Sequence, residues 1–191
     1  MSSEKLARAA DAHTAVCRQL VETCSDDLER FARQLVETFH GGQRLFIIGS
    51  GPLGALASLA ANRFIYRLDL DRPALPAMAL TSDAVLASAL GRDGNSDQVF
   101  SRQLGALAAP GDVVLALAGD EQDALLRNGL ATAREIGCQT ALLTSAHSPL
   151  LREQFDMVFV CDADSSARRD EAILFACHLL CELVEAELFG I

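Results

Sequence analysis

The chain has 191 residues, half of them hydrophobic, which is enough for one domain with its own core. Its formal net charge of −10 disfavours direct nucleic-acid binding, which needs clustered Lys and Arg. No apolar run is long enough to cross a membrane and the amino terminus has no signal-peptide character, so we expect a cytoplasmic protein with no membrane role.

Residues 4–40 are predicted to be helical, because apolar side chains recur there at helical spacing. Ser25 and the two aspartates after it have the pattern of a helix break followed by a new N-cap, which predicts two helices. Gly41 and Gly42 would end the second helix. We therefore interpret the whole chain, 1–191, as a single domain, with N-terminal assembly helices in 1–42 and an α/β core in 43–191.

After residue 43, short apolar runs alternate with helical segments. Uninterrupted apolar runs are typical of strands that helices cover on both faces of a parallel sheet. The sequence predicts an α/β fold, a three-layer sandwich around a five-stranded parallel sheet. The strands are expected at 45–48, 77–80, 113–117, 140–143 and 157–160, and the helices at about 52–66, in segments up to 107, at 121–136 and at 166–188.

The carboxyl ends of parallel strands are where such sheets bind ligands. Gly49, Ser50 and Gly51 follow the first strand and open a helix. This turn either lets the backbone approach a phosphate or is only a tight connection, with Pro52 at the helix start. Together with Gly54 it matches the dinucleotide pattern, but no acidic residue closes the second strand as that pattern requires. The turn, residues 81–83 and residues 118–123 are predicted to surround one cleft.

Six cysteines occur in the chain, none of them in a CxxC pair. This usage favours small buried side chains in a reducing compartment. A structural zinc site would need four convergent ligands, which the spacing does not indicate. We expect neither a metal nor a cofactor.

Several segments, in order and spacing, resemble the phosphoheptose isomerase family, whose fold is the sugar-isomerase (SIS) domain. The resemblance covers about residues 1–189 and rests on Gly49-Ser50-Gly51, residues 72–83, 99–104, 110–113, 166–168 and 181–185. It implies a homotetramer that uses its N-terminal helices for assembly, and a sugar-phosphate ligand. The ligand-binding positions that carry over are Gly49, Ser50, Gly51, Thr81, Ser82 and Asp93.

The family isomerises sedoheptulose 7-phosphate, which requires groups that move protons between adjacent atoms. Its catalytic and metal-binding positions fall here on Leu59, Arg63, Asp170 and His178. Leu59 can neither transfer a proton nor bind a metal, and Arg63 cannot act as a base near neutral pH. We therefore expect no catalytic residues and no metal at these positions. His178 alone matches the family, and a lone histidine on an apolar helix face is more often a packed core residue.

At the phosphate loop of the family, this chain also lacks the family's functional side chains. Where the family has hydroxyl and amide side chains, this chain has Ala118-Gly119-Asp120-Glu121-Gln122-Asp123. Its carboxylates would repel a phosphate dianion. A family serine in the first loop falls on Leu53, whereas Thr81, Ser82, Asp83 and Asp93 remain similar to the family.

A non-catalytic subgroup of the family, the DnaA initiator-associating proteins (DiaA), offers another reading. Their last helix ends in a Leu-Phe pair that resembles Leu188-Phe189, and the Phe contributes to binding the replication initiator DnaA. Our leading hypothesis is therefore a non-enzymatic, homotetrameric regulator that binds a DnaA-type initiator through Leu188 and Phe189. The alternatives are a phosphoheptose isomerase or a sugar-phosphate sensor, and for the Leu-Phe pair simple packing against another subunit.

Overall fold

A computed structural model of the chain describes residues 2–69, 71–81, 83–119, 122–148, 150 and 154–190. Within these residues the sheet has five strands in the order β2-β1-β3-β4-β5, and every neighbouring pair is parallel. This confirms the predicted sheet. Its strands are β1 (Leu45–Gly49), β2 (Ala77–Ala79), β3 (Val113–Leu117), β4 (Gln139–Thr144) and β5 (Met157–Val160).

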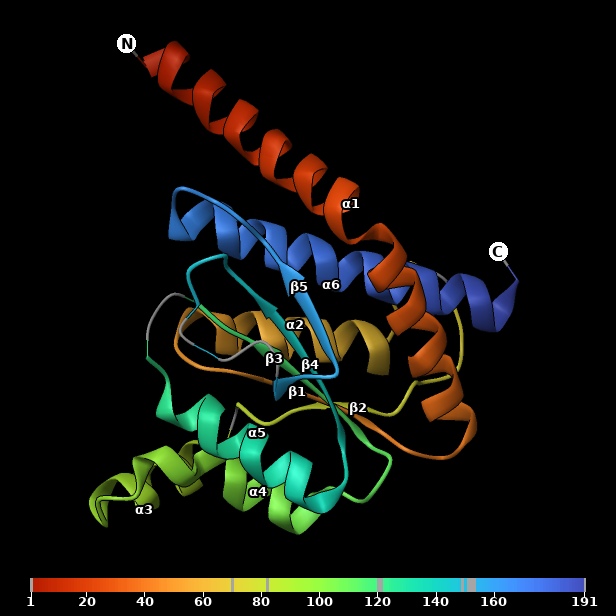
Figure 1. Cartoon of the computed structure of the whole chain (residues 1–191), viewed down its shortest axis with the longest axis vertical. Coiled ribbons are helices and arrows are strands. Elements are labelled where there is room, and N and C mark those ends of the chain that lie inside the picture. Colours follow the sequence, from red (N-terminus) through yellow and green to blue (C-terminus); the bar gives the residue numbers. More distant parts are fainter. Residues whose placement is uncertain are drawn as a thin grey trace.

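Helices cover both faces of the sheet, as the buried strands require (Figure 1). One layer contains α1 (Ser2–His40), α2 (Pro52–Ile65) and α6 (Ser166–Phe189). The other contains α4 (Val99–Leu107) and α5 (Ala124–Ile136), next to α3 (Ala84–Arg92) and the short 3₁₀ helix η1 (Ser96–Gln98). Among the described residues, no helix is long and apolar enough to span a membrane.

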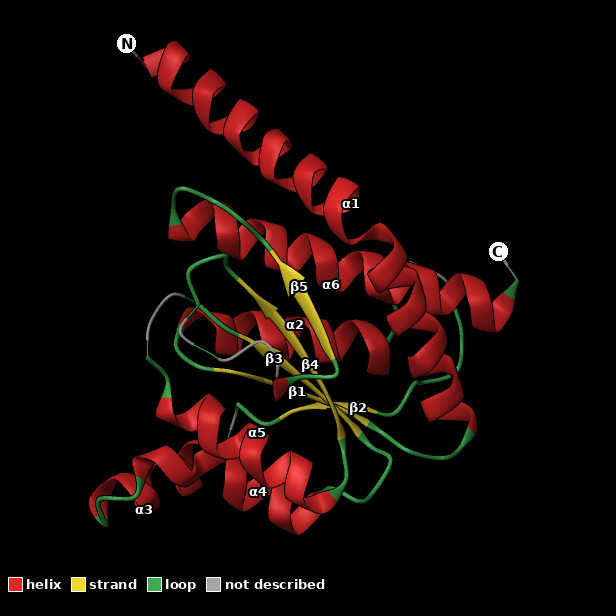
Figure 2. Cartoon of the chain, viewed as in Figure 1, coloured by secondary structure: helices red, strands yellow, loops and turns green. Residues whose placement is uncertain are grey.

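The alternation of side chains along each strand divides the core in two. In β1, Leu45 and Ile47 belong to the cluster shared with α1, α2 and α6, whereas Phe46 and Ile48 belong to the cluster shared with α4 and α5. Successive strand residues point to opposite faces, so an unbroken apolar run supplies both clusters. The yellow strands between red helices in Figure 2 show the resulting three-layer sandwich.

The predicted break at Ser25 is wrong, because α1 is one continuous helix. Cys24 and Leu28, four residues apart, are both buried on the face that packs on the domain. On the other side Ser25 is exposed and Asp27 pairs with Arg30 at 2.6 Å. Tertiary packing therefore keeps the helix continuous through polar residues that favour a cap in isolation.

The homotetramer stays a prediction.

A buried ion pair joins α2 to α6 at the carboxyl end of α2. Arg72 Nε lies 2.7 Å from Glu185 Oε1, and the two side chains are only 1% and 3% exposed. The Arg72 guanidinium also donates to the carbonyls of Phe64 (2.8 Å) and Arg63 (2.9 Å), which satisfies the end of α2. The backbone N–H of Leu68 donates to the same Glu185 oxygen at 3.2 Å. The pair therefore anchors a helix end, a loop and a second helix together.

We expect Glu185→Gln to lower the free energy of unfolding by about 3–5 kcal/mol, because the variant leaves the Arg72 charge buried without its counter-ion. Urea denaturation would measure the loss. Glu187→Gln is the matched control, since Glu187 lies on the same helix but is exposed. Equal stability of the two variants would contradict the role given to the ion pair.

Candidate functional site

Two adjoining cavities lie at the C-terminal edge of the sheet, where the sequence places the cleft. Their volumes are about 460 and 580 Å³, and Ser50, Gly51 and Leu125 line both of them. The first cavity extends toward Thr81 and α3, and the second toward α6. Together they form one cleft between the glycine turn and the amino end of α5, at the point where the strand order changes direction.

The backbone conformation of the glycine turn requires glycine at two positions. A Cβ atom on Gly49 would lie 2.7 Å from the carbonyl oxygen of Leu53, and Gly51 has a φ of 53°. The first value forbids a side chain and the second favours glycine, so the chain can turn directly from β1 into α2. Pro52 begins that helix, as expected. Gly49, Ser50 and Gly51 line the first cavity; their contact with a ligand stays a prediction.

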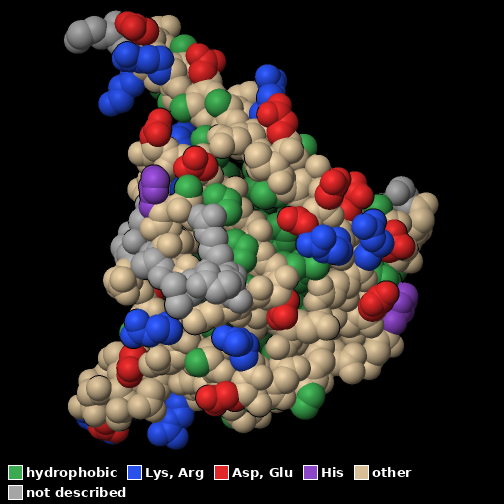
Figure 3. Space-filling model, in the orientation of Figure 1, with side chains coloured by type: hydrophobic (Ala, Val, Ile, Leu, Met, Phe, Trp, Pro, Cys, Tyr) green, Lys and Arg blue, Asp and Glu red, His purple; other side chains and the backbone are tan. Residues whose placement is uncertain are grey.

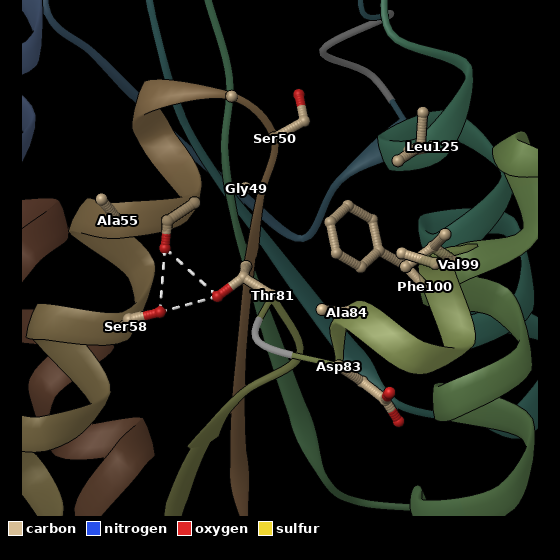
Figure 4. Close-up of a pocket in the computed structure, with 13 residues that line it drawn as sticks. Gly49, Ser50, Ala55, Ser58, Thr81, Asp83, Ala84, Val99, Phe100 and Leu125 are labelled. Atoms are coloured by element: carbon tan, nitrogen blue, oxygen red, sulfur yellow. Dashed lines mark hydrogen bonds between the residues drawn. The ribbon is translucent and has the colours of Figure 1, made fainter. Parts of the chain in front are cut away.

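Two hydroxyl groups face each other on one wall of the first cavity (Figure 4). The oxygens of Ser58 and Thr81 lie 2.7 Å apart, and both hydroxyls also contact the carbonyl of Gly54. Thr81 therefore lies in the predicted cleft. Asp83 lines the same cavity and caps α3 by accepting from the N–H of Leu86 at 2.8 Å.

Two other predicted binding residues are not placed in the cleft. Ser82 lies outside the described residues, as do Asp120 and Glu121 of the acidic loop. Asp93 ends α3, pairs with its neighbour Arg92 at 3.0 Å, and does not line either cavity. Its part in ligand binding stays a prediction.

Asp123 connects the glycine turn to α5. One of its carboxylate oxygens accepts from the N–H groups of Leu125 (2.9 Å) and Leu126 (3.2 Å), which makes it the N-cap of α5. The other oxygen accepts a hydrogen bond from the Ser50 hydroxyl. The helix therefore begins at Ala124 and not at the predicted 121, and the carboxylate is part of the cleft wall.

The amino end of α6 supplies the opposite wall of the second cavity. Ser166, Arg169 and Asp170 line it. Arg169 is buried, with a side chain only 7% exposed, and its Nε lies 3.2 Å from Asp170 Oδ1. A buried guanidinium beside a carboxylate is a feature that the sequence analysis missed. Asp170, a family position, thus lies in the cleft.

The other three family positions lie farther along α2 and α6. Arg63 and His178 interact electrostatically, and burial followed by the Arg63 charge lowers the pKa of His178 from its ordinary value. Arg63 Nε and His178 Nε2 are buried without a hydrogen-bond partner. His178, half-buried on α6, is therefore a neutral imidazole near pH 7. Leu59 is half-buried on α2.

The family's metal does not fit these residues. Leu59 has no ligating atom and Arg63 carries a positive charge, which leaves only Asp170 and His178 as donors. In the part of the chain that the structure describes, no group of three His, Cys, Asp or Glu side chains could hold a metal ion.

We expect Arg63→Met to raise the pKa of His178, because it removes a neighbouring positive charge that opposes protonation. A pH titration of the imidazole signals by NMR would measure this. Since the folded-state pKa is lowered, the unfolded state binds a proton at His178 more readily, so the stability of the fold is unaffected by this group above pH 6.5 and falls as the pH drops below that value. An unchanged pKa in the variant would contradict the electrostatic coupling.

Comparison with known proteins identifies the relatives of the chain. The family profile described as SIS domain matches residues 10–145. A phosphoheptose isomerase of Trichlorobacter lovleyi is 31% identical over 97% of this chain and 95% of the relative. One from Pelobacter propionicus is 37% identical over 83% and 84%. The solved structure of a phosphoheptose isomerase from Francisella tularensis, 20% identical, superposes with a TM-score of 0.89 over 96% of this chain and 98% of that one.

Proposed function

This chain belongs to the SIS-domain family, among the phosphoheptose isomerases, and on that premise we propose that it binds a sugar in the cleft at the C-terminal edge of its sheet. The observation that supports this most is the cleft itself, which hydroxyl and carboxylate groups line from four separate elements. Such groups hydrogen-bond polyhydroxyl ligands, and cavities of this size suit a monosaccharide.

The names of the relatives support isomerisation of sedoheptulose 7-phosphate better than a regulatory role. The side chains of this chain argue for binding without that turnover. An aldose–ketose shift needs an acid and a base in contact with adjacent atoms of the sugar. At the family positions, Leu59 and Arg63 supply neither group, and His178 does not line either cavity of the cleft.

We expect the purified protein to isomerise sedoheptulose 7-phosphate at least about a hundredfold more slowly than the Francisella tularensis enzyme in the same assay, because positioned acid–base groups supply that much. Sedoheptulose should nevertheless raise the melting temperature of the protein. Comparable turnover by the two proteins would show that the chain is an isomerase and would overturn the proposal of binding alone.

A regulator of replication initiation is the second candidate. Phe189, the last residue of α6, is 37% exposed, whereas Leu188 beside it packs partly against the core. An accessible aromatic side chain at a helix end suits a protein partner. Charge is mixed on the face shown in Figure 3, where Lys and Arg lie beside Asp and Glu. Together with the formal net charge of −10, this favours a role at DNA that acts through a protein such as a DnaA-type initiator over direct contact with DNA.

We expect Phe189→Ala to weaken binding to a DnaA-type initiator by about tenfold without changing the melting temperature or the sedimentation coefficient. Val85→Ala is the control, because Val85 is also an exposed apolar residue but lies far from Phe189 in the sequence. A loss of oligomer or of thermal stability would instead assign Phe189 to subunit packing. No binding by the parent protein would remove this candidate.

A further inference from the structure

The amino end of α5 is the place in the cleft where an anion would ordinarily bind. Backbone N–H groups converge there and the helix dipole favours negative charge. In this chain the Asp123 carboxylate accepts from the N–H groups of Leu125 and Leu126 through one oxygen and from the Ser50 hydroxyl through the other. These three donors are thus already used by a carboxylate of the protein itself.

The remaining charges on the described wall of the second cavity do not restore an anion site. Asp170 adds a second carboxylate, and the buried Arg169 has its Nε on that carboxylate at 3.2 Å. Two carboxylates and one guanidinium leave this wall with a net charge of −1. A phosphate dianion placed here would lose its hydration and meet like charge at short range.

We propose that Asp123 fills the anion position of this cleft, so that the cleft selects a polyhydroxyl ligand without a phosphate group. The inference deepens the proposed function and rests on it. Carboxylates accept hydrogen bonds from sugar hydroxyls, and Gln122 and Ser166 add both donors and acceptors. Leu53 and Leu125 supply apolar surface for the C–H face of a sugar ring.

The test compares sedoheptulose, sedoheptulose 7-phosphate and inorganic phosphate by calorimetry, on the parent protein and on two variants. Asp123→Ser removes the charge and releases the Ser50 hydroxyl. Asp123→Asn removes the charge but keeps one oxygen for the helix cap, and its amide nitrogen can donate to the Ser50 oxygen. Ser and Asn are both good N-caps, so α5 and the fold should persist, which melting temperatures would check.

We expect the parent protein to bind sedoheptulose at least about tenfold more tightly than its 7-phosphate, a difference of about 1.4 kcal/mol. Asp123→Ser should reverse this preference and gain affinity for inorganic phosphate, and Asp123→Asn should reduce it. Tighter binding of the 7-phosphate by the parent, or an unchanged preference in Asp123→Ser, would overturn the inference.

The same experiment separates this inference from the proposed function. If the parent binds neither sugar, the proposed sugar binding fails. In that case, phosphate binding by Asp123→Ser but not by the parent would still support the exclusion of anions by Asp123, and its absence from both proteins would overturn that as well.

Discussion

The buried ion pair between Arg72 and Glu185 is the contact on which the arrangement of α2 and α6 depends. Both helices begin at the C-terminal edge of the sheet, where they line the cleft, and run back from it. The ion pair joins them at the other end and satisfies the last carbonyls of α2. Removing two charges from water is costly, so the pair favours folding only because each partner also has further hydrogen bonds.

Between the ion pair and the cleft, Arg63 and His178 are the polar groups that packing leaves unsatisfied. A buried nitrogen without a hydrogen-bond partner costs about 1–3 kcal/mol. At Asp123, by contrast, both carboxylate oxygens have partners. The two regions therefore differ physically, because Asp123 in the cleft has partners for both oxygens, whereas Arg63 and His178 each keep a buried nitrogen without one, at a cost to stability.

The sequence predicts the sheet well because its strands are buried on both faces and read as unbroken apolar runs, such as 45–48 and 113–117. The break at Ser25 fails because helix capping is a local signal, whereas the burial of Cys24 and Leu28 against the domain is not. The glycine turn is predictable, since the need for glycine at Gly49 and Gly51 comes from the backbone conformation and close contacts of the turn itself.

The sequence could not predict which side chains contact one another in the site and in the buried ion pair. Ser50 and Asp123 are 73 residues apart and Arg72 and Glu185 are 113 apart, and neither pair has a local signature. The sequence analysis placed Asp123 inside a helix predicted at 121–136 and so missed its N-cap role. Even an N-cap pattern does not indicate a hydroxyl donor on the other side of a cleft.

The position of Asp123 explains how the ligand chemistry of the cleft can change while the fold stays the same. A helix N-cap accepts Ser and Asp almost equally well, so α5 is stable with either residue. The same choice decides whether the amino end of α5 offers its donors to a ligand anion or satisfies them with a carboxylate of the chain. Membership in the family therefore fixes the sheet and the place of the cleft, whereas a substitution that is nearly neutral for folding sets the charge of the ligand.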